Sequence, residues 1–323
     1  MGTRAGQFLK RILIKRGNLG LTVYDDLLKL KGCFSKRLSD EEMTAIRFKK
    51  VFGREIDLEH PVTLNEKIQW LKLNVREDIQ TVMADKYGAR EYIRNHFGEE
   101  YLVPLLFVTS DWRDITLDNL PDEPCIVKPN HGTGCYEIIR DKNKVDILDL
   151  RVKCLEWLNM DFYRITQEWP YRNIKRKIIV EKLLQTREDT IPNDYKLNYI
   201  NGKLEFIYCS VGRESENKRN IYDADWKPLY FSWVEADKDT ANIRGKEIAP
   251  PATLPKMMEI GERIARNFAY VRVDFYDVDG RLYIGEITFY HGGGFDVFVP
   301  SEYDEYYGKK LILPDPARRQ KTK

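Results

Sequence analysis

The chain has 323 residues, of which 42% are hydrophobic, 12% aromatic and 32% charged, and its net charge is +2. This length allows two lobes, because a single hydrophobic core stops growing at about 250–300 residues. The apolar content excludes wholesale disorder, and no run approaches the ~20 apolar residues of a membrane-spanning helix. The five cysteines are never spaced CxxC and the four histidines lie far apart, which argues against a disulfide framework, a zinc site or a histidine-built metal site.

Positive charge gathers at the two ends of the chain. Residues 1–37 hold nine Lys or Arg against two Asp, and the tail after Pro316 is basic without an acid. The segment from Phe8 to Arg16 fits an amphipathic element that rests on an anionic membrane surface, with solvated termini as the alternative. No signal peptide is visible and the body has no sustained basic face. We therefore expect a cytoplasmic protein without a nucleic-acid partner, and keep peripheral contact with the inner face of the membrane as an open prediction.

The residue pattern divides the chain into four zones. Residues 1–75 form a helical N-terminal region with a basic start, and residues 76–180 a first, smaller lobe. Residues 181–310 form a C-terminal lobe, followed by a basic tail at 311–323. The elements expected before residue 180 are the helices 40–52, 64–73, 85–95 and 149–158, the extended segment 102–108 and the buried strand 125–128.

Two hairpins and a helix are expected in the C-terminal lobe. Strands at 195–200 and 204–210 flank an Asn-Gly turn, and strands at 271–278 and 282–288 flank an Asp-Gly turn. A helix at 254–268 separates the two hairpins. The sequence therefore predicts an α+β protein whose second half is mostly antiparallel sheet.

A lysine and a glycine loop follow the first buried strand. Lys128 ends the strand, and Gly132, Thr133 and Gly134 come directly after it. A point cation combined with backbone N–H groups that approach closely is what a phosphate needs. An ordinary tight turn is the alternative, because neither a Walker loop nor GxGxxG is present.

The last hairpin combines carboxylates with an arginine. Arg272, Asp274, Glu286 and Thr288 occupy alternate positions, which places them on one face of their strands, while the apolar residues between them suit the packed face. Two carboxylates on one face repel each other unless a cation joins them, and magnesium fits because it prefers oxygen ligands and phosphate. An exposed, salt-bridged face is the alternative.

A third set surrounds the strand that ends near Glu181. Glu181, Lys182 and Leu183 fit a hinge beside a flat apolar slot, the surroundings that an adenine ring requires, and Asp194 and Lys196 follow.

Taken together, these pieces resemble the ATP-grasp superfamily. Lys86 resembles its early nucleotide lysine, Lys128 with its glycine loop resembles the second lysine and phosphate-covering loop, and the last hairpin resembles the metal-binding RxD…ExN ending. Thr288 departs from this pattern, because most ATP-grasp enzymes carry Asn there. More closely, residues 48–308 resemble the TupA-like branch associated with bacterial surface polysaccharides. The segments that carry this match are 61–73, 85–87, 167–169, 194–196, 220–226 and 285–294.

The resemblance implies two α+β lobes with ATP between them, preceded by the helical N-terminal region. It also implies a reaction in which a carboxylate attacks the γ-phosphate to give an acyl phosphate, and an amine then displaces phosphate. The implied roles are catalysis by Arg272 and Lys128, Mg²⁺ binding by Asp274, Glu286 and Thr288, and ATP binding by Lys86, Lys128, Gly132, Thr133, Gly134, Glu181, Lys182, Leu183, Asp194 and Lys196.

Acceptor recognition is expected from two further segments. Arg213, Lys218 and Arg219 suit a substrate that bears a carboxylate or phosphate, although a charged loop without function is the alternative. His291, Gly292 and Gly293 follow the metal-binding strand and are expected to contact the acceptor.

The expected function is an ADP-forming carboxylate–amine ligase that adds an amino acid or similar amine to a uronic-acid-containing surface polysaccharide or its precursor. Its expected partners are an acidic glycan and a small amine, and it uses ATP and Mg²⁺. The alternatives are a glycan kinase, a glycosyltransferase suggested by three DxD tripeptides, and a catalytically silent nucleotide-binding scaffold.

Overall fold

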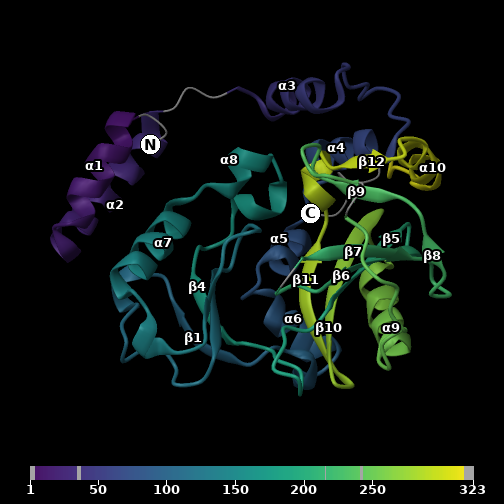
Figure 1. Ribbon diagram of the computed structural model, residues 1–323. Coiled ribbons are helices and arrows are strands. Elements are labelled where there is room, and N and C mark those ends of the chain that lie inside the picture. The colour runs from purple at the N-terminus through teal and green to yellow at the C-terminus, as the bar shows by residue number, and fades with distance from the viewer. Residues whose placement is uncertain (1–3, 35–37, 215, 241–242, 316–323) are drawn as a thin grey trace. The chain divides into compact units, whose positions relative to one another are not determined.

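The computed structural model describes residues 4–34, 38–214, 216–240 and 243–315 (Figure 1). The chain divides into two compact units, and each unit is assembled from segments that are distant in sequence. Unit 1 comprises Met1–Leu38, Pro104–Phe162 and Asn173–Leu183, and unit 2 comprises Ser39–Val103, Tyr163–Arg172 and Leu184–Lys323, in each case within the described residues. The basic tail proposed after Pro316 lies outside the described residues.

Unit 1 is built on a four-stranded antiparallel sheet of order β1-β4-β2-β3. Alternate side chains of its central strands are fully buried, and they pack against helix α7, whose own buried residues include Leu150 and Leu155. The elements of this unit are α1 (Arg4–Ile14), α2 (Gly17–Phe34), β1 (Leu105–Thr109), β2 (Cys125–Pro129), β3 (Glu137–Ile139), α7 (Ile147–Asn159) and β4 (Ile178–Lys182). Helix α8 (Phe162–Thr166) begins at the end of a unit 1 segment.

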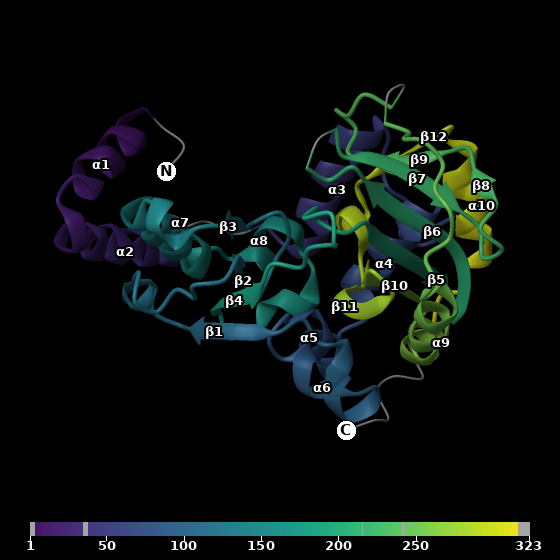
Figure 2. The same ribbon diagram turned by 60° about the horizontal axis from the view of Figure 1, so that its bottom comes forward.

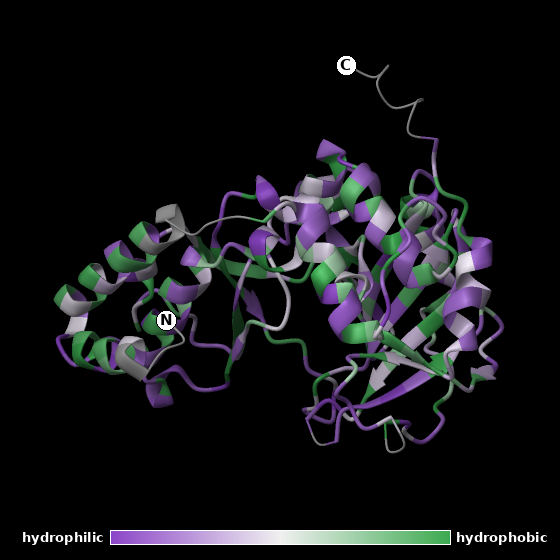
Figure 3. Cartoon of the chain, turned by 90° about the horizontal axis from the view of Figure 1, so that it is seen from above, coloured by the Kyte–Doolittle hydropathy of each residue, from purple (hydrophilic) through white to green (hydrophobic). Residues whose placement is uncertain are grey.

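The two N-terminal helices pack against each other and bury one side. Leu13, Leu21 and Tyr24 belong to the core of unit 1. The other side leaves large apolar side chains exposed: Phe8, Leu9, Ile12, Leu19, Val23 and Leu30. Hydrophobic and hydrophilic residues interleave along both helices in Figure 3. None of the helices within the described residues is both long and apolar enough to cross a membrane.

Unit 2 is built on a six-stranded antiparallel sheet of order β11-β10-β5-β6-β7-β8, with a separate pair β12-β9 (Figure 2). Helix α9 packs on this sheet through Met257, Ile260 and Ile264. The helices are α3 (Asp40–Phe52), α4 (Leu64–Asn74), α5 (Asp78–Ala84), α6 (Ala89–His96), α9 (Leu254–Ala265) and α10 (Glu302–Lys310). The strands are β5 (Asp194–Ile200), β6 (Lys203–Val211), β7 (Lys218–Tyr222), β8 (Pro228–Leu229), β9 (Ser232–Val234), β10 (Tyr270–Val278), β11 (Arg281–Thr288) and β12 (Val297–Val299).

Both predicted hairpins are present, because their turns suit the twist of the strands. Asn201 and Gly202 both have positive φ, as do Asp279 and Gly280, which is the backbone of a tight two-residue hairpin. Helix α4 begins with a capping box, since Thr63 accepts a hydrogen bond from the N–H of Glu66 and the Glu66 carboxylate accepts from the N–H of Thr63.

The predicted helix 85–95 is wrong at its beginning. Helix α5 ends at Ala84 and α6 begins at Ala89, so that Asp85 and Lys86 lie in the turn between them. The Asp85 carboxylate accepts a hydrogen bond from the N–H of Tyr87 at 2.8 Å, a local bond that competes with helix formation. The segment 102–108 is likewise strand only from Leu105, after Pro104, which has no N–H to donate.

The compact units differ from the zones drawn at residues 75, 180 and 310. Helix α4 belongs to unit 2 because Leu64, Ile68 and Leu71 enter the core of the six-stranded sheet. Its Asn65 also donates hydrogen bonds to the carboxylate of Asp304 in α10. Packing, rather than chain order, therefore determines which segments form one unit.

Candidate functional site

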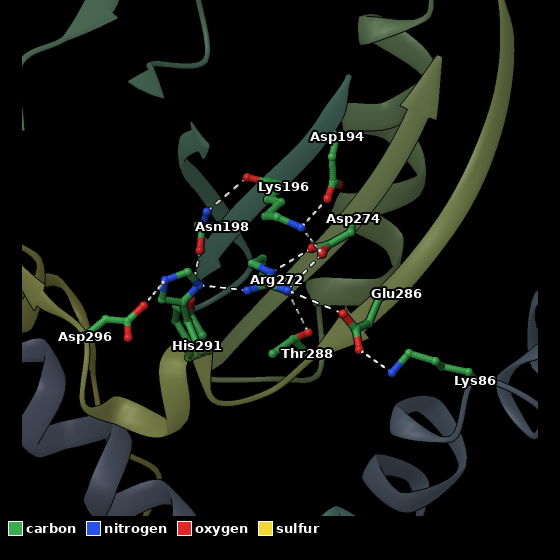
Figure 4. Close-up of polar contacts among 11 residues, drawn as sticks. Lys86, Asp194, Lys196, Asn198, Arg272, Asp274, Glu286, Thr288, His291 and Asp296 are labelled. Atoms are coloured by element: carbon green, nitrogen blue, oxygen red, sulfur yellow. Dashed lines mark hydrogen bonds and ion pairs between the residues drawn. The ribbon is translucent and has the colours of Figure 1, made fainter. Parts of the chain in front are cut away.

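A grid of polar residues lies across three neighbouring strands of unit 2 (Figure 4). On β5, β10 and β11, Lys196 pairs with Asp274, which pairs with Glu286. Two residues further along each strand, Asn198 pairs with Arg272, which pairs with Thr288. Paired residues point to the same face of a sheet, so the register itself brings these side chains together.

A β-bulge at Gly285 adjusts this register. Asp274 pairs with Glu286, but the next residue, Phe275, pairs with Ile284, which leaves Gly285 as an extra residue in β11. A Cβ at this position would lie 2.7 Å from the ring of Tyr276, so only glycine fits without a shift. The bulge places Ile284 with the core and Glu286 with the polar face.

Arg272 is the centre of the grid. It is buried, and its guanidinium donates two parallel hydrogen bonds to Asp274, at 2.7 and 2.8 Å. It also donates to Thr288 Oγ1 at 3.2 Å and lies 3.6 Å from Glu286 Oε2. Burial opposes the charge, but Asp274 and Glu286 outweigh it and raise the pKa of Arg272. The face is salt-bridged, as the alternative supposed, but it is not exposed, because Arg272 and Asp274 are buried and Glu286 and Thr288 are half-buried.

Two lysines complete the charge balance. Lys86 donates to Glu286 at 2.7 Å, and Lys196 donates to Asp274 at 2.7 Å and to Asp194 at 2.5 Å. Burial alone would raise the pKa of each carboxyl, but Arg272 and Lys196 lower the pKa of Asp274 and Lys86 lowers that of Glu286. The repulsion expected between the two carboxylates is thus already offset by side-chain cations, and the cluster holds three cations against three carboxylates.

His291 links the grid to the glycine loop that follows β11. Its Nδ1 lies 2.8 Å from Arg272 NH1, and because a guanidinium only donates, Nδ1 must be the accepting nitrogen. The proton therefore sits on Nε2, which lies 3.1 Å from Asp296 Oδ2. Trp233 stacks on the ring with centroids 4.0 Å apart. Burial lowers the pKa of His291 below 6.5, and Arg272 and Lys196 add to this effect against the carboxylate of Asp296.

This environment predicts a pH dependence of stability. The unfolded chain takes up a proton on His291 near pH 6.5, whereas the folded ring resists it, so its contribution is present above pH 6.5 and lost as the pH falls through the lowered pKa. The free energy of unfolding of His291→Asn, measured in urea from about pH 5 to 8, should fall less on acidification than that of the wild type. His96→Asn, a change at an exposed histidine, should keep the wild-type slope. An unchanged slope in His291→Asn would contradict this assignment.

Two side chains of α4 that the sequence analysis did not single out hold the glycine loop. Gln69 donates to the carbonyls of Gly293 and Gly294 at 3.0 and 2.8 Å, and Lys72 donates to that of Gly293 at 3.0 Å. Both are buried, and they satisfy carbonyls that would otherwise be buried without a partner, those of Gly293 and Gly294, which have positive φ. Gln69 and Lys72 stand three apart beside Ile68, Leu71 and Leu73, and polar residues at this spacing on the buried face of a helix are the signal that could have identified them.

The predicted phosphate loop and hinge lie in unit 1. Lys128 of β2 pairs with Glu181 of the neighbouring strand β4 at 2.7 Å. Gly132 and Gly134 have positive φ, and a Cβ on Gly132 would lie 2.7 Å from the ring of Phe162. Thr133 is exposed.

The backbone of the predicted hinge is already hydrogen-bonded within unit 1. The N–H of Lys182 donates to Pro104 and that of Leu183 to Pro124, both at 2.9 Å. The side chain of Lys182 pairs with Glu123. A role of this hinge and of Lys128 in ATP binding stays a prediction.

The three basic residues predicted to bind the acceptor do not form one cluster. Arg213 lies over the ring of Tyr276 at 5.5 Å and Lys218 pairs with Glu216 at 3.1 Å. Arg219 lies over the ring of Tyr208 at 5.7 Å. Lys218 and Arg219 are neighbours in β7, so their side chains leave opposite faces of the sheet.

The donor chemistry of the grid fits a magnesium ion. Asp274 and Glu286 offer carboxylate oxygens and Thr288 offers a hydroxyl, all of them hard ligands. Within the described ranges, no group of three or more His, Cys, Asp or Glu could hold a metal ion.

A family model described as TupA-like ATPgrasp matches residues 66–312, which is more than half of the chain. The chain therefore belongs to the TupA-like ATP-grasp family and is an ATP-grasp enzyme of α+β fold. The family resemblance noted in the sequence is confirmed, with a match that begins at residue 66 rather than 48 and ends at 312 rather than 308.

Several solved structures are similar to the chain at low identity. D-alanine–D-alanine ligase from Bacillus anthracis is 17% identical with a TM-score of 0.40, and the match covers 78% of this chain and 83% of that one. The corresponding ligase from Helicobacter pylori is 14% identical, with a TM-score of 0.36 and coverage of 72% and 62%. ATP-grasp ligase PsnB with its minimal precursor is 13% identical, with a TM-score of 0.36, and the match covers 69% of this chain but 58% of PsnB. Among curated proteins, none matches the chain. The family assignment rests on the family model.

Proposed function

We propose that the protein is an ATP-dependent, ADP-forming ligase that joins an amine to the carboxylate of an acidic sugar in a surface polysaccharide or its precursor. The observation that carries this proposal is the partly buried, charge-balanced cluster of Lys86, Lys196 and Arg272 with Asp194, Asp274 and Glu286. The acidic sugar, the amine and the polysaccharide follow from the family resemblance.

The cluster suits a magnesium–polyphosphate substrate because each charge in it has a partner that can be exchanged. Lys86 and Glu286 are the more accessible pair, with side chains 13% and 17% exposed. With a polyphosphate and its cation bound, Lys86 would donate to phosphate oxygens in place of the carboxylate, and Glu286 would hold the cation in place of the lysine. Neither Lys86 nor Glu286 would then be left without a charged partner. The free-energy cost of removing these two charges from water is already offset in the folded protein, so binding adds little to it. Magnesium supplies neutralisation of phosphate charge, with Asp274, Glu286 and Thr288 as its protein ligands.

The guanidinium of Arg272 is held in place by several contacts. Its two hydrogen bonds to Asp274 and its contact with His291 fix the guanidinium, while Thr288 and Glu286 lie on its other side. A fixed cation that needs no reorganisation stabilises charge that develops during phosphoryl transfer.

Three of the described cysteines agree with a reaction that forms no covalent intermediate on them. Cys125, Cys154 and Cys209 are buried, and burial raises the pKa of the thiol to about 11 in Cys125 and about 12 in Cys154. Such thiols are poor nucleophiles at neutral pH. A covalent thioester intermediate on these residues is therefore not part of the proposal.

The test is the identity of the products. The purified chain would be incubated with ATP, Mg²⁺, an oligogalacturonate and a set of amino acids, followed by nucleotide analysis and mass spectrometry of the glycan. We expect ADP, phosphate and a glycan that has gained the amine. AMP and pyrophosphate would overturn the acyl-phosphate mechanism. A phosphorylated glycan without amine would identify a glycan kinase, and sugar transfer without ATP a glycosyltransferase.

Contact of the N-terminal helices with an anionic membrane is a second part of the proposal. The side chain of Phe8 is 66% exposed and that of Leu19 is 76% exposed, and the exposed residues Arg11, Lys15 and Arg16 lie among the apolar ones. Apolar side chains that enter the headgroup region beside basic ones that meet anionic lipid would give reversible binding.

Vesicle binding tests this contact. Phe8→Glu combined with Leu19→Glu should weaken binding to phosphatidylserine-containing vesicles by at least about 10-fold, since each apolar side chain contributes roughly 1.5–3 kcal/mol on burial. Ile312→Glu makes the same type of change at a 72% exposed residue of unit 2 and should have no effect. Equal binding by all three proteins in a flotation assay would contradict the membrane contact.

A further inference from the structure

A cavity of about 390 Å³ lies in unit 2, at the end of the sheet that carries β7 and β8. This volume falls within the range of roughly 300–1,000 Å³ typical of small-molecule sites. Arg219, Arg244, Tyr230 and Ser232 line it. The cavity thus combines two arginines, an aromatic face and a hydroxyl.

Arg219 brings a positive charge into this cavity without an acidic partner. It is partly buried, and it lies over the ring of Tyr208 at 5.7 Å. Within the residues that the structure describes, no carboxylate forms an ion pair with Arg219. A half-buried guanidinium loses part of its hydration, and hydrogen bonds to an anion in the cavity would compensate for this loss.

Arg244 brings a second positive charge to the same wall. Its guanidinium stacks over Tyr230 at 4.2 Å, and its carboxylate partner is Glu247, at 3.2 Å and more than half exposed. The side chain of Tyr230 is 70% exposed. Two arginines that line one cavity repel each other unless an anion lies with them, and an exposed ring beside them offers an apolar face of the size of a sugar ring.

The cavity connects to the candidate catalytic grid through two residues. Arg219 lies over Tyr208, and the ring of Tyr208 lies 6.0 Å from that of His291. His291 in turn contacts Arg272 at 2.8 Å. A ligand in the cavity would therefore be near the grid without occupying it.

We propose that this cavity binds the carboxylate of an acidic sugar that neighbours the reacting sugar in the acceptor glycan. The proposal rests on the proposed function and specifies its acceptor: a glycan with at least two acidic sugars, one at the grid and the other held by Arg219 and Arg244. The planar guanidinium fork suits a carboxylate in two parallel hydrogen bonds, and Tyr230 packs against the sugar ring.

Binding of an oligogalacturonate, measured by isothermal titration calorimetry without ATP, tests this directly. Its fully methyl-esterified form, in which the carboxylates are neutral, is the matched probe. We expect the acid to bind and the ester to bind at least about 10-fold more weakly, since hydrogen bonds to charged groups are stronger than those to neutral groups.

Three variants locate the binding. Arg219→Gln and Arg244→Gln should each weaken binding of the acid about 10-fold or more, and Tyr230→Ala, at an exposed residue whose loss the fold tolerates, should weaken both probes. Arg263→Gln is the control, because Arg263 also lies over an aromatic ring, that of Phe97 at 4.7 Å, but lies outside the cavity. It should bind like the wild type.

ATP hydrolysis by the same variants separates this inference from the proposed function. If the folded Arg219→Gln, Arg244→Gln and Tyr230→Ala proteins bind the acid as the wild type does, the cavity is not the acceptor site, even when ATP turnover is normal. Equal affinity of the wild type for acid and ester would also overturn it. If the acid binds as expected but ATP is not turned over with any amine, the proposed ligase function fails while the glycan site stands.

Discussion

Replacing Glu286 by Gln is expected to lower ATP turnover by at least about 100-fold, because it removes a negative charge from the pair that would hold magnesium. The structure also predicts a loss of stability without nucleotide. Lys86 and Arg272 lose a charged partner, and Lys86 has the larger influence on the pKa of Glu286, ahead of the repulsion from Asp274. We expect a decrease of about 1–3 kcal/mol in the free energy of unfolding, measured by urea denaturation. Relief of the repulsion between Asp274 and Glu286 acts in the opposite direction, but the loss of the contact with Lys86 outweighs it.

Glu259→Gln is the matched control for this variant. Glu259 also pairs with a lysine at 2.7 Å, Lys256, but both side chains lie exposed on helix α9. Its replacement should leave turnover and stability close to those of the wild type. A Glu286→Gln protein that turns over ATP at the wild-type rate would remove Glu286 from the site, whatever its stability.

Replacing Arg272 by Ala is expected to be the most destabilising change in the grid. Asp274 would lose two hydrogen bonds and, among the residues that the structure describes, keep only Lys196 as a cationic partner, while it stays buried. Breaking a buried ion pair by removing one partner typically costs about 3–5 kcal/mol. Urea denaturation of Arg272→Ala measures this loss, and turnover is then compared at equal folded fraction, where it should still fall by orders of magnitude while ATP affinity changes less.

A double variant distinguishes the charge from the packing. Arg272→Leu with Asp274→Leu removes both charges together, and it should recover much of the stability that Arg272→Ala loses, because no buried charge is left unpaired. Its turnover should stay low. Wild-type stability of Arg272→Ala would contradict the central role of this arginine.

The local part of the site could be predicted from the sequence. Alternation of polar and apolar residues, together with an Asp-Gly turn, was enough to place Arg272, Asp274, Glu286 and Thr288 on one face, and the pairing of β10 with β11 confirms it. These signals act over a few residues, within one hairpin.

The charge partners could not be predicted in the same way. Lys196 meets Asp274 from 78 positions away, and Lys86 meets Glu286 from 200 positions away. Both contacts depend on how β5 and the turn after α5 pack against the hairpin, which no local pattern encodes. The grouping of α4 with the C-terminal half depends on packing of the same kind.

The bulge at Gly285 makes the length of β11 as important as its composition. In a regular strand Ile284 and Glu286, two residues apart, would point to the same face, and either the core or the polar grid would lose a side chain. The extra residue reverses the alternation of side chains between them. Ile284 therefore enters the core, while Glu286 joins the polar face. Deletion of the single residue Gly285 would therefore move either the side chains before it or those after it to the opposite face of the sheet.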